Sequence, residues 1–182
     1  MSALRPCHAR AAALLACLLA LPSLASIAAE SAGASASAPL PIAAVATIEA
    51  RLGTLATHER PLDGISTEGA RATAYLADGG IAKIEMVALG ERGRVLLDAW
   101  WRGQTLIAVR ERRIDYGDTI MNLPTDKPLP LTTVQDDLVS YGNGAPKLWT
   151  NGRPIAAGPQ VRQRTRELAA RAERVRASML KR

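Results

Sequence analysis

The chain has 182 residues, a formal net charge of +6, two cysteines, two histidines and no phenylalanine. A zinc site needs three or four histidine, cysteine or carboxylate ligands, so these few residues argue against one. The basic charge lies at the C-terminal end: residues 161–182 hold seven arginines and one lysine against two glutamates, and residues 30–160 hold 13 basic and 15 acidic residues.

The first 29 residues have the three parts of a secretory signal. Arg5 and Arg10 precede an uncharged apolar run over 11–21, and Ser23-Leu24-Ala25 and Ser26-Ile27-Ala28 offer small side chains for cleavage. The run is shorter than the roughly 20 residues that span a bilayer. We therefore expect a signal peptide over 1–29, a periplasmic or secreted protein, and no transmembrane segment in the mature chain.

Cys17 raises the alternative of a lipid anchor. It follows Leu14-Leu15-Ala16, which resembles a lipobox, but apolar residues continue behind it at 18–20. A lipidated cysteine begins the mature chain, so the sequence favours cleavage further on. The mature protein would then contain no cysteine and no disulfide.

Residues 30–41 are small, polar and end in prolines, which is typical of a flexible tether. The remainder, 42–182, has the length of a single domain. For an exported protein with a near-neutral central part, nucleic acid is not an expected partner.

The domain begins with a predicted helix from Ile42 to about His58. Its apolar residues recur at spacings of three and four, which places them on one face. They are Ile42, Val45, Ile48, Leu52 and Leu55. Pro61 ends the pattern.

From Ala70 the apolar period changes to two, and short glycine-containing turns separate the segments. Connections this short require antiparallel neighbours. The predicted strands are Ala70–Ala77, Ile81–Leu89, Arg94–Trp101, Thr105–Ile114, Asp137–Tyr141 and Lys147–Thr150. In the predicted strand 81–89, alternation places Ala82, Ile84, Met86 and Ala88 on one face. In the predicted strand 94–101, it places Val95, Leu97, Ala99 and Trp101 on one face. Asn151-Gly152-Arg153-Pro154 is expected to form a final turn.

Residues 115–135 interrupt this rhythm with Pro124, Pro128 and Pro130, so a long loop is expected. Asp115, Asp118 and Asp126 could contact a calcium ion there. Their spacing matches no calcium-binding loop, and solvated carboxylates are the favoured interpretation.

The last segment, 159–180, is predicted to be a helix with a narrow apolar stripe. The stripe consists of Val161, Leu168 and Val175, with Ala172 and Met179 beside it. A basic amphipathic helix can be drawn to an anionic envelope surface. Because this stripe has no aromatic residue to insert, we expect it to pack on the sheet while the arginines remain solvated.

The strands contain a weak repeat of an aromatic strand end, a glycine turn and an apolar returning strand. Its units start at Ala74-Tyr75-Leu76, Ala99-Trp100-Trp101 and Ser140-Tyr141-Gly142. This pattern resembles the hairpin units of small uncharacterised secreted or periplasmic bacterial proteins. The resemblance covers about residues 42–156 and implies no activity.

The candidates for catalysis do not form a convincing set. Ser66 lies in a stretch resembling a nucleophile elbow, but no strand precedes it and its second glycine comes one residue late. His58 is expected to end the first helix. Asp136 and Asp137 are adjacent on a strand and must point to opposite faces. We therefore predict no catalytic, cofactor or metal site.

The aromatic residues are the best candidates for a binding surface. Trp100 and Trp101 must face opposite sides of the sheet, so one belongs to the core and the other could line an open face. The candidate surface comprises Trp100, Trp149, Tyr75 and Tyr141. The alternative is that helices cover both faces.

Together these features predict an α+β fold: an antiparallel meander of about six strands with an N-terminal and a C-terminal helix. The expected function is a non-enzymatic binding or accessory protein of the bacterial envelope, with an envelope protein or anionic envelope surface as partner. The alternatives are a periplasmic carrier of a small or apolar ligand and, last, a hydrolase. An apolar pocket between sheet and helix would favour a carrier, and an uncovered strand edge would favour a protein partner.

Overall fold

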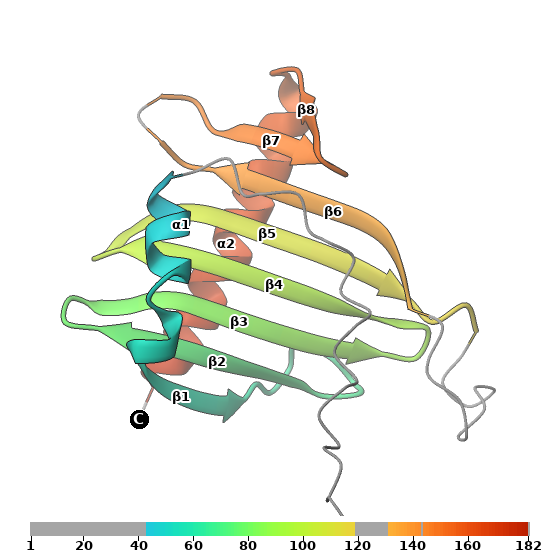
Figure 1. Cartoon of the computed structure of the whole chain (residues 1–182). Coiled ribbons are helices and arrows are strands. Elements are labelled where there is room, and N and C mark those ends of the chain that lie inside the picture. Colours follow the sequence, from blue (N-terminus) through green and yellow to red (C-terminus); the bar gives the residue numbers. More distant parts are fainter. Residues whose placement is uncertain (1–42, 119–130, 143, 182) are drawn as a thin grey trace, which may run out of the picture. The chain divides into compact units, whose positions relative to one another are not determined.

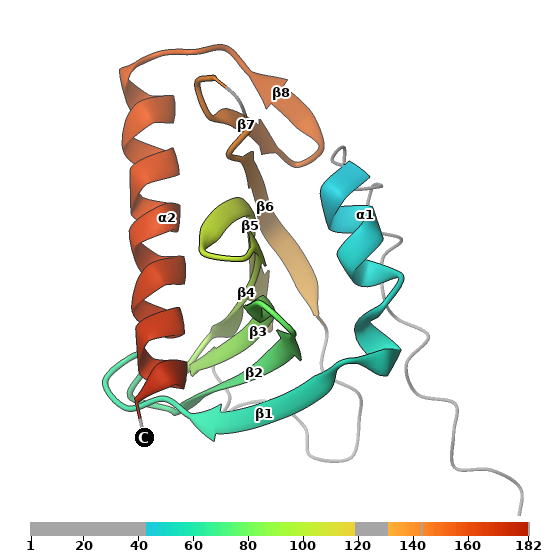
Figure 2. The ribbon, with the colours of Figure 1, turned by 90° about the vertical axis from the view of Figure 1, so that its left-hand side faces the viewer.

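The computed structural model describes residues 43–118, 131–142 and 144–181. The predicted signal and tether, the three loop prolines and Asp126 lie outside these ranges. The described residues form an α+β unit in which one antiparallel sheet lies between a short helix and a long helix. Figures 1 and 2 show the two helices on opposite faces of the sheet.

The sheet is a meander of eight strands, in which each strand pairs only with its neighbours along the chain. The strands are β1 (Ala56–Pro61), β2 (Ala70–Ala77), β3 (Gly80–Gly90), β4 (Gly93–Arg102), β5 (Thr105–Asp115), β6 (Thr132–Ser140), β7 (Lys147–Thr150) and β8 (Arg153–Ile155). The helices are α1 (Ala43–Glu49) and α2 (Pro159–Leu180), with a short 3₁₀ turn, η1, at Leu52–Thr54. The predicted class and meander order are confirmed, but the predicted count of about six strands is too low.

The first additional strand, β1, replaces the end of the predicted N-terminal helix, because residues 56–58 pair with β2. The α-helix ends at Glu49, and His58 lies exposed in β1 opposite Ala74 instead of at a helix end. Gly53 is a poor helix residue. Backbone groups of residues 56–61 instead form hydrogen bonds with β2, so tertiary structure outweighs the helical spacing of the apolar residues.

The second additional strand, β8, follows the turn that was expected to end the sheet. Asn151 and Gly152 have positive φ angles of 50° and 77°. Two such residues are typical of the tight turn that joins antiparallel strands. Arg153–Ile155 consequently returns along β7.

The main core lies between the sheet and α2, on what we call the α2 face. Leu97, Trp101 and Ile84 are buried there against Leu168 and Val175. The whole predicted stripe of α2 is buried, so its packing on the sheet is confirmed. Arg60 of β1 donates to the backbone oxygen of Ser178 at 3.0 Å, which ties the first strand to the C-terminal end of α2.

A β-bulge alters one predicted face. The register shifts between Tyr75 and Leu76, so that Tyr75 pairs with Lys83 and Leu76 pairs with Ile81. Ala82 is left between these pairs. Ile84, Met86 and Ala88 belong to the core under α2 as expected, but Ala82 does not join it.

Candidate functional site

The two adjacent tryptophans lie on opposite faces, and both are buried. Trp101 packs under α2 and donates from Nε1 to Glu173 Oε1 at 3.1 Å. Trp100 packs against Val45 of α1 and Ala108 of β5 on the other face of the sheet, which we call the α1 face. Helices therefore cover both rings, and Trp100 offers no open aromatic surface.

The structure does not bring the four candidate aromatic residues onto one surface. Tyr141 lies on the α2 face, where its hydroxyl donates to the backbone oxygen of Thr165 at 2.6 Å and burial raises its pKa. Trp149 is half-buried in β7 opposite Leu138. Tyr75 is half-buried. Of the other three aromatic residues, it alone shares a neighbour with Trp100.

That shared neighbour is Lys83, which is buried on the α1 face. Its Nζ lies 5.3 Å from the Trp100 ring centroid and 5.8 Å from the Tyr75 ring centroid. It also lies 2.8 Å from Glu49 Oε1 and 2.6 Å from Glu85 Oε1. Burial lowers the pKa of Lys83, but the hydrogen bonds to both glutamates outweigh it and raise that pKa above its ordinary value. The ammonium is thus fully satisfied and fixes the end of α1.

Beyond α1, charged side chains continue across the same face of the sheet. Arg112 donates to Asp98 at 3.1 Å, and Arg110 forms a two-point contact with Asp136. Burial raises the pKa of Asp98, although Lys83 and Arg112 act in the opposite direction. Each of these four charged side chains therefore has a partner of opposite charge within the domain.

A cavity of about 300 Å³ lies where α1 and η1 approach the ends of two hairpins. Its walls come from α1 and the segment after it, from the β2–β3 turn and from the β4–β5 turn. The lining residues are Ala44, Thr47, Ile48, Arg51, Leu55, Ala77, Gly79, Gly80, Ile81, Ala82, Trp101, Arg102 and Gly103. Apart from the two arginines and one threonine, every lining side chain is apolar or absent.

Local geometry explains why this space stays open. The bulge turns Ala82 into the cavity wall, and its small side chain leaves room. The two turns approach each other at their glycines: a Cβ added to Gly79 would lie 4.0 Å from Gly103 Cα, in ordinary van der Waals contact. Gly103 has a φ of 59°, which glycine adopts without strain.

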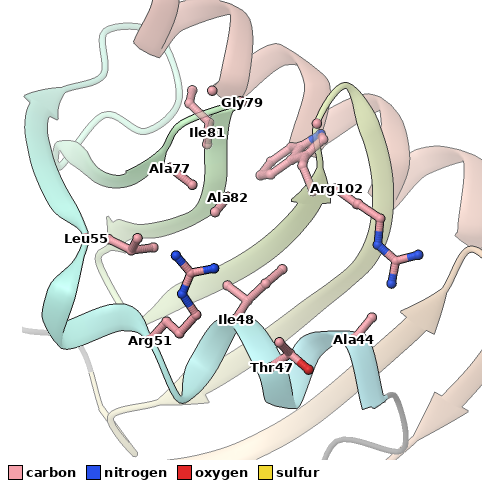
Figure 3. A pocket seen from close by; sticks show the side chains of 13 residues that line it. Ala44, Thr47, Ile48, Arg51, Leu55, Ala77, Gly79, Ile81, Ala82 and Arg102 are labelled. Atoms are coloured by element: carbon pink, nitrogen blue, oxygen red, sulfur yellow. The ribbon is translucent and has the colours of Figure 1, made fainter.

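Figure 3 shows how the arginines relate to this cavity. Arg51 reaches over the hollow near Ile48 and Leu55, and Arg102 stands at its other end. Both arginines are exposed, whereas Ile81, Ala82 and Trp101 are buried. The cavity therefore has an apolar interior and a basic rim.

The α2 face contains a buried ionic network that the sequence did not reveal. Glu111 of β5 and Asp137 of β6 are both essentially inaccessible. Arg164 of α2 donates to both carboxylates at 2.8 Å, and Arg171 also contacts Glu111. The expectation that the arginines of α2 are solvated is therefore wrong for Arg164 and Arg171. It is also wrong for Arg176, which is buried and contacts Gln104.

The remaining polar candidates are placed apart from one another. Asp136 and Asp137 point to opposite faces, and their partners are Arg110 and Arg164. The Ser66 hydroxyl donates to the backbone oxygen of Leu89. Asp115 accepts from the backbone N–H of Gly117 at 2.7 Å. Across the described residues, no group of three or more histidine, cysteine or carboxylate side chains is positioned to hold a metal ion.

No protein family, no curated protein and no solved structure matches the chain. None of the helices in the described part of the chain is both long and apolar enough to cross a membrane.

Sequence reasoning missed the cavity and its two arginines. Ile48 and Leu55 were predicted to lie on one face of a continuous helix. In that helix Arg51 would be one of several polar residues beside the stripe. The sequence feature that could have indicated this arrangement is Gly53, which interrupts the helical pattern and lets the chain bend around the cavity.

Proposed function

We propose that this protein is a non-enzymatic binding protein of the bacterial envelope that holds a small apolar ligand between α1 and the sheet. The observation that carries the proposal is the cavity of about 300 Å³ with an apolar interior. Ligand sites are typically concave and mostly apolar, with a few polar groups that set orientation, and this volume lies at the lower end of their usual range.

The composition of the lining favours binding over catalysis. The lining residues include no histidine, carboxylate or cysteine, and Thr47 provides the one hydroxyl. A general base or an activated nucleophile therefore has no candidate in this lining. Apolar contact and charge attraction are the interactions that these residues can offer a ligand.

The envelope assignment rests on the sequence of the first 29 residues, which has the parts of a secretory signal. In cells that export the protein, intact-mass analysis should find a mature chain that starts between Ser26 and Glu30. A lipid adduct on Cys17, or retention of the N-terminal segment, would contradict this assignment.

A second candidate function, an accessory protein with an envelope protein as partner, is favoured by the outer edge of β1, which pairs with no further strand among the described residues. Leu62 N–H bonds to Ala70 oxygen, so the N–H groups of Thr57 and Glu59 point away from β2. Pro61 occupies the next outward position, where its missing N–H breaks no pairing within the sheet. An extended segment of a partner could add here as a ninth strand, and Thr57→Pro would then weaken that binding.

The cavity proposal is tested with N-phenyl-1-naphthylamine, a neutral apolar dye whose fluorescence rises in apolar surroundings. We expect saturable binding with one site per chain. Ala82→Leu and Ala77→Leu, which fill the cavity, should weaken it, whereas Ala46→Leu, on an exposed position of α1 outside the lining, should not. Absence of saturable binding, or equal binding by all three variants when folded, would overturn the proposal.

A further inference from the structure

We infer that the ligand of this cavity is a small anionic amphiphile, a straight-chain carboxylate whose tail enters the cavity and whose head group pairs with a guanidinium at the rim, that of Arg51 or that of Arg102. The inference rests on the proposed binding function and adds the chemical class of the ligand. It follows from the distribution of charge around the cavity, the partners of the two arginines and the space inside.

The described residues that line the cavity carry charge of one sign. Among them, Arg51 and Arg102 are the only charged side chains. The nearest carboxylate of α1, that of Glu49, already accepts hydrogen bonds from Trp100 and Lys83. An anionic head group at either end of the rim therefore meets a guanidinium group, and a cationic one would be repelled.

Neither guanidinium is committed elsewhere. In the described part of the chain, the guanidinium groups of Arg51 and Arg102 form no ion pair and no hydrogen bond with another residue. Other arginines of the domain, such as Arg110 and Arg164, are held by carboxylates. Arginine presents a planar set of donors that matches a carboxylate with two parallel hydrogen bonds. The two rim arginines thus keep their full capacity for an anion.

The volume and the apolar walls of the cavity determine which ligand tail fits. At about 30 Å³ for a group the size of a water molecule or a methylene, 300 Å³ accommodates roughly ten such groups. The buried walls, Ile81, Ala82 and Trp101, present apolar surface to them. A second hollow of about 450 Å³ shares Ala44 and Arg102 with the first, so the region around Arg102 is open on both sides. A medium-length alkyl chain with a terminal carboxylate fits this arrangement.

The test compares sodium decanoate, 1-decanol and decyltrimethylammonium as competitors of the naphthylamine dye at neutral pH. The three share a tail and differ in head-group charge. We expect decanoate to bind at least about tenfold more tightly than decanol, the difference that one favourable ionic contact provides. Decyltrimethylammonium should bind most weakly. Arg51→Gln and Arg102→Gln should each reduce the preference for decanoate, and Arg51→Lys should retain part of it.

Arg153→Gln is the matched control, because Arg153 is exposed in β8 and outside the lining. Equal or tighter binding of decanol would overturn the inference while the binding function stands. Dye binding that none of the three competitors displaces would also overturn the inference and leave the binding function in place. If neither the dye nor decanoate binds, the binding function and the inference both fail.

Discussion

The indole nitrogen of Trp100 donates a 2.6 Å hydrogen bond to Oε1 of Glu49, the last residue of α1. The same oxygen lies 2.8 Å from the Lys83 ammonium. Together with Val45 and Ile48, these contacts fix a seven-residue helix to the sheet. Since an isolated helix of that length is not stable in water, the contacts with the sheet maintain the wall of the cavity.

Glu49→Ala should therefore loosen α1. We expect a loss of about 1 kcal/mol in the free energy of unfolding, because Glu49 is partly exposed and solvent weakens its ion pair. Amide hydrogens of α1 should also exchange faster while those of β3 and β4 do not. Glu91→Ala, in the exposed turn between β3 and β4, is the control. Unchanged exchange in α1 would show that its apolar contacts suffice.

Leu97→Ala tests the assignment of faces in the central sheet. Leu97 is fully buried under α2, so its truncation should cost about 2–5 kcal/mol in urea denaturation. Leu89→Ala, at a position 42% exposed, should cost about 0.5 kcal/mol or less. A small effect at Leu97 would mean that the buried face has been assigned to the wrong side.

The ionic network under α2 predicts a large effect from one carboxylate. Glu111→Ala leaves Arg164 and Arg171 without their shared partner, and breaking a buried pair in this way typically costs about 3–5 kcal/mol. Glu167→Ala removes a half-exposed carboxylate from the same helix and should cost little. If both substitutions had similar small effects on the free energy of unfolding, Glu111 would not anchor α2.

Asp98 predicts a specific pH dependence. Because burial raises its pKa in the folded protein, the folded state holds this proton more tightly than the unfolded state. Its contribution to stability therefore falls as the pH rises from the ordinary value of 3.8 through the folded-state pKa. Denaturation of wild type and Asp98→Asn at several pH values should show the wild type losing stability relative to the variant over this interval. A relative gain would contradict the raised pKa.

The exposed arginines of α2 carry the predicted attraction to an anionic envelope surface. Arg162, Arg166 and Arg174 remain solvent-exposed, so their joint replacement by glutamine should abolish co-sedimentation with anionic vesicles at low salt. Attraction without insertion should also disappear at high salt. Binding that persists in the triple variant, or at high salt, would require another contact with the vesicles.

Periodicity predicted the strands from Ala70 to Ile114, the end of β6, β7 and the final helix because those segments bury alternate or helically spaced side chains against one core. The expected loop over 115–135 was too long, since β6 begins at Thr132 and pairs with β5 from there. Periodicity failed at β1, because the predicted helix extended to His58 and residues 56–58 pair with β2 instead. It also failed at β8, whose three exposed residues contain no apolar pattern and follow from the Asn151-Gly152 turn.

The site was harder to predict than the fold. Alternation along the strand predicted that Trp100 and Trp101 lie on opposite faces of the sheet. Coverage of both faces by helices was the stated alternative to an open aromatic surface. The cavity depends on a bulge at Ala82, on two glycine turns that meet, and on where α1 ends. These features come from distant segments, so local sequence patterns did not show that Arg51 and Arg102 border one cavity.

The most direct test of the central claim is a titration of methyl-labelled protein with sodium decanoate, followed by NMR. Ile48 and Ile81 line the cavity, whereas Ile114 and Ile155 lie outside that lining. We predict saturable shifts of the Ile48 and Ile81 methyl signals, with Ile114 and Ile155 unchanged. Shifts confined to Ile114 and Ile155, or no saturable shift at Ile48 and Ile81, would contradict a binding site between α1 and the sheet.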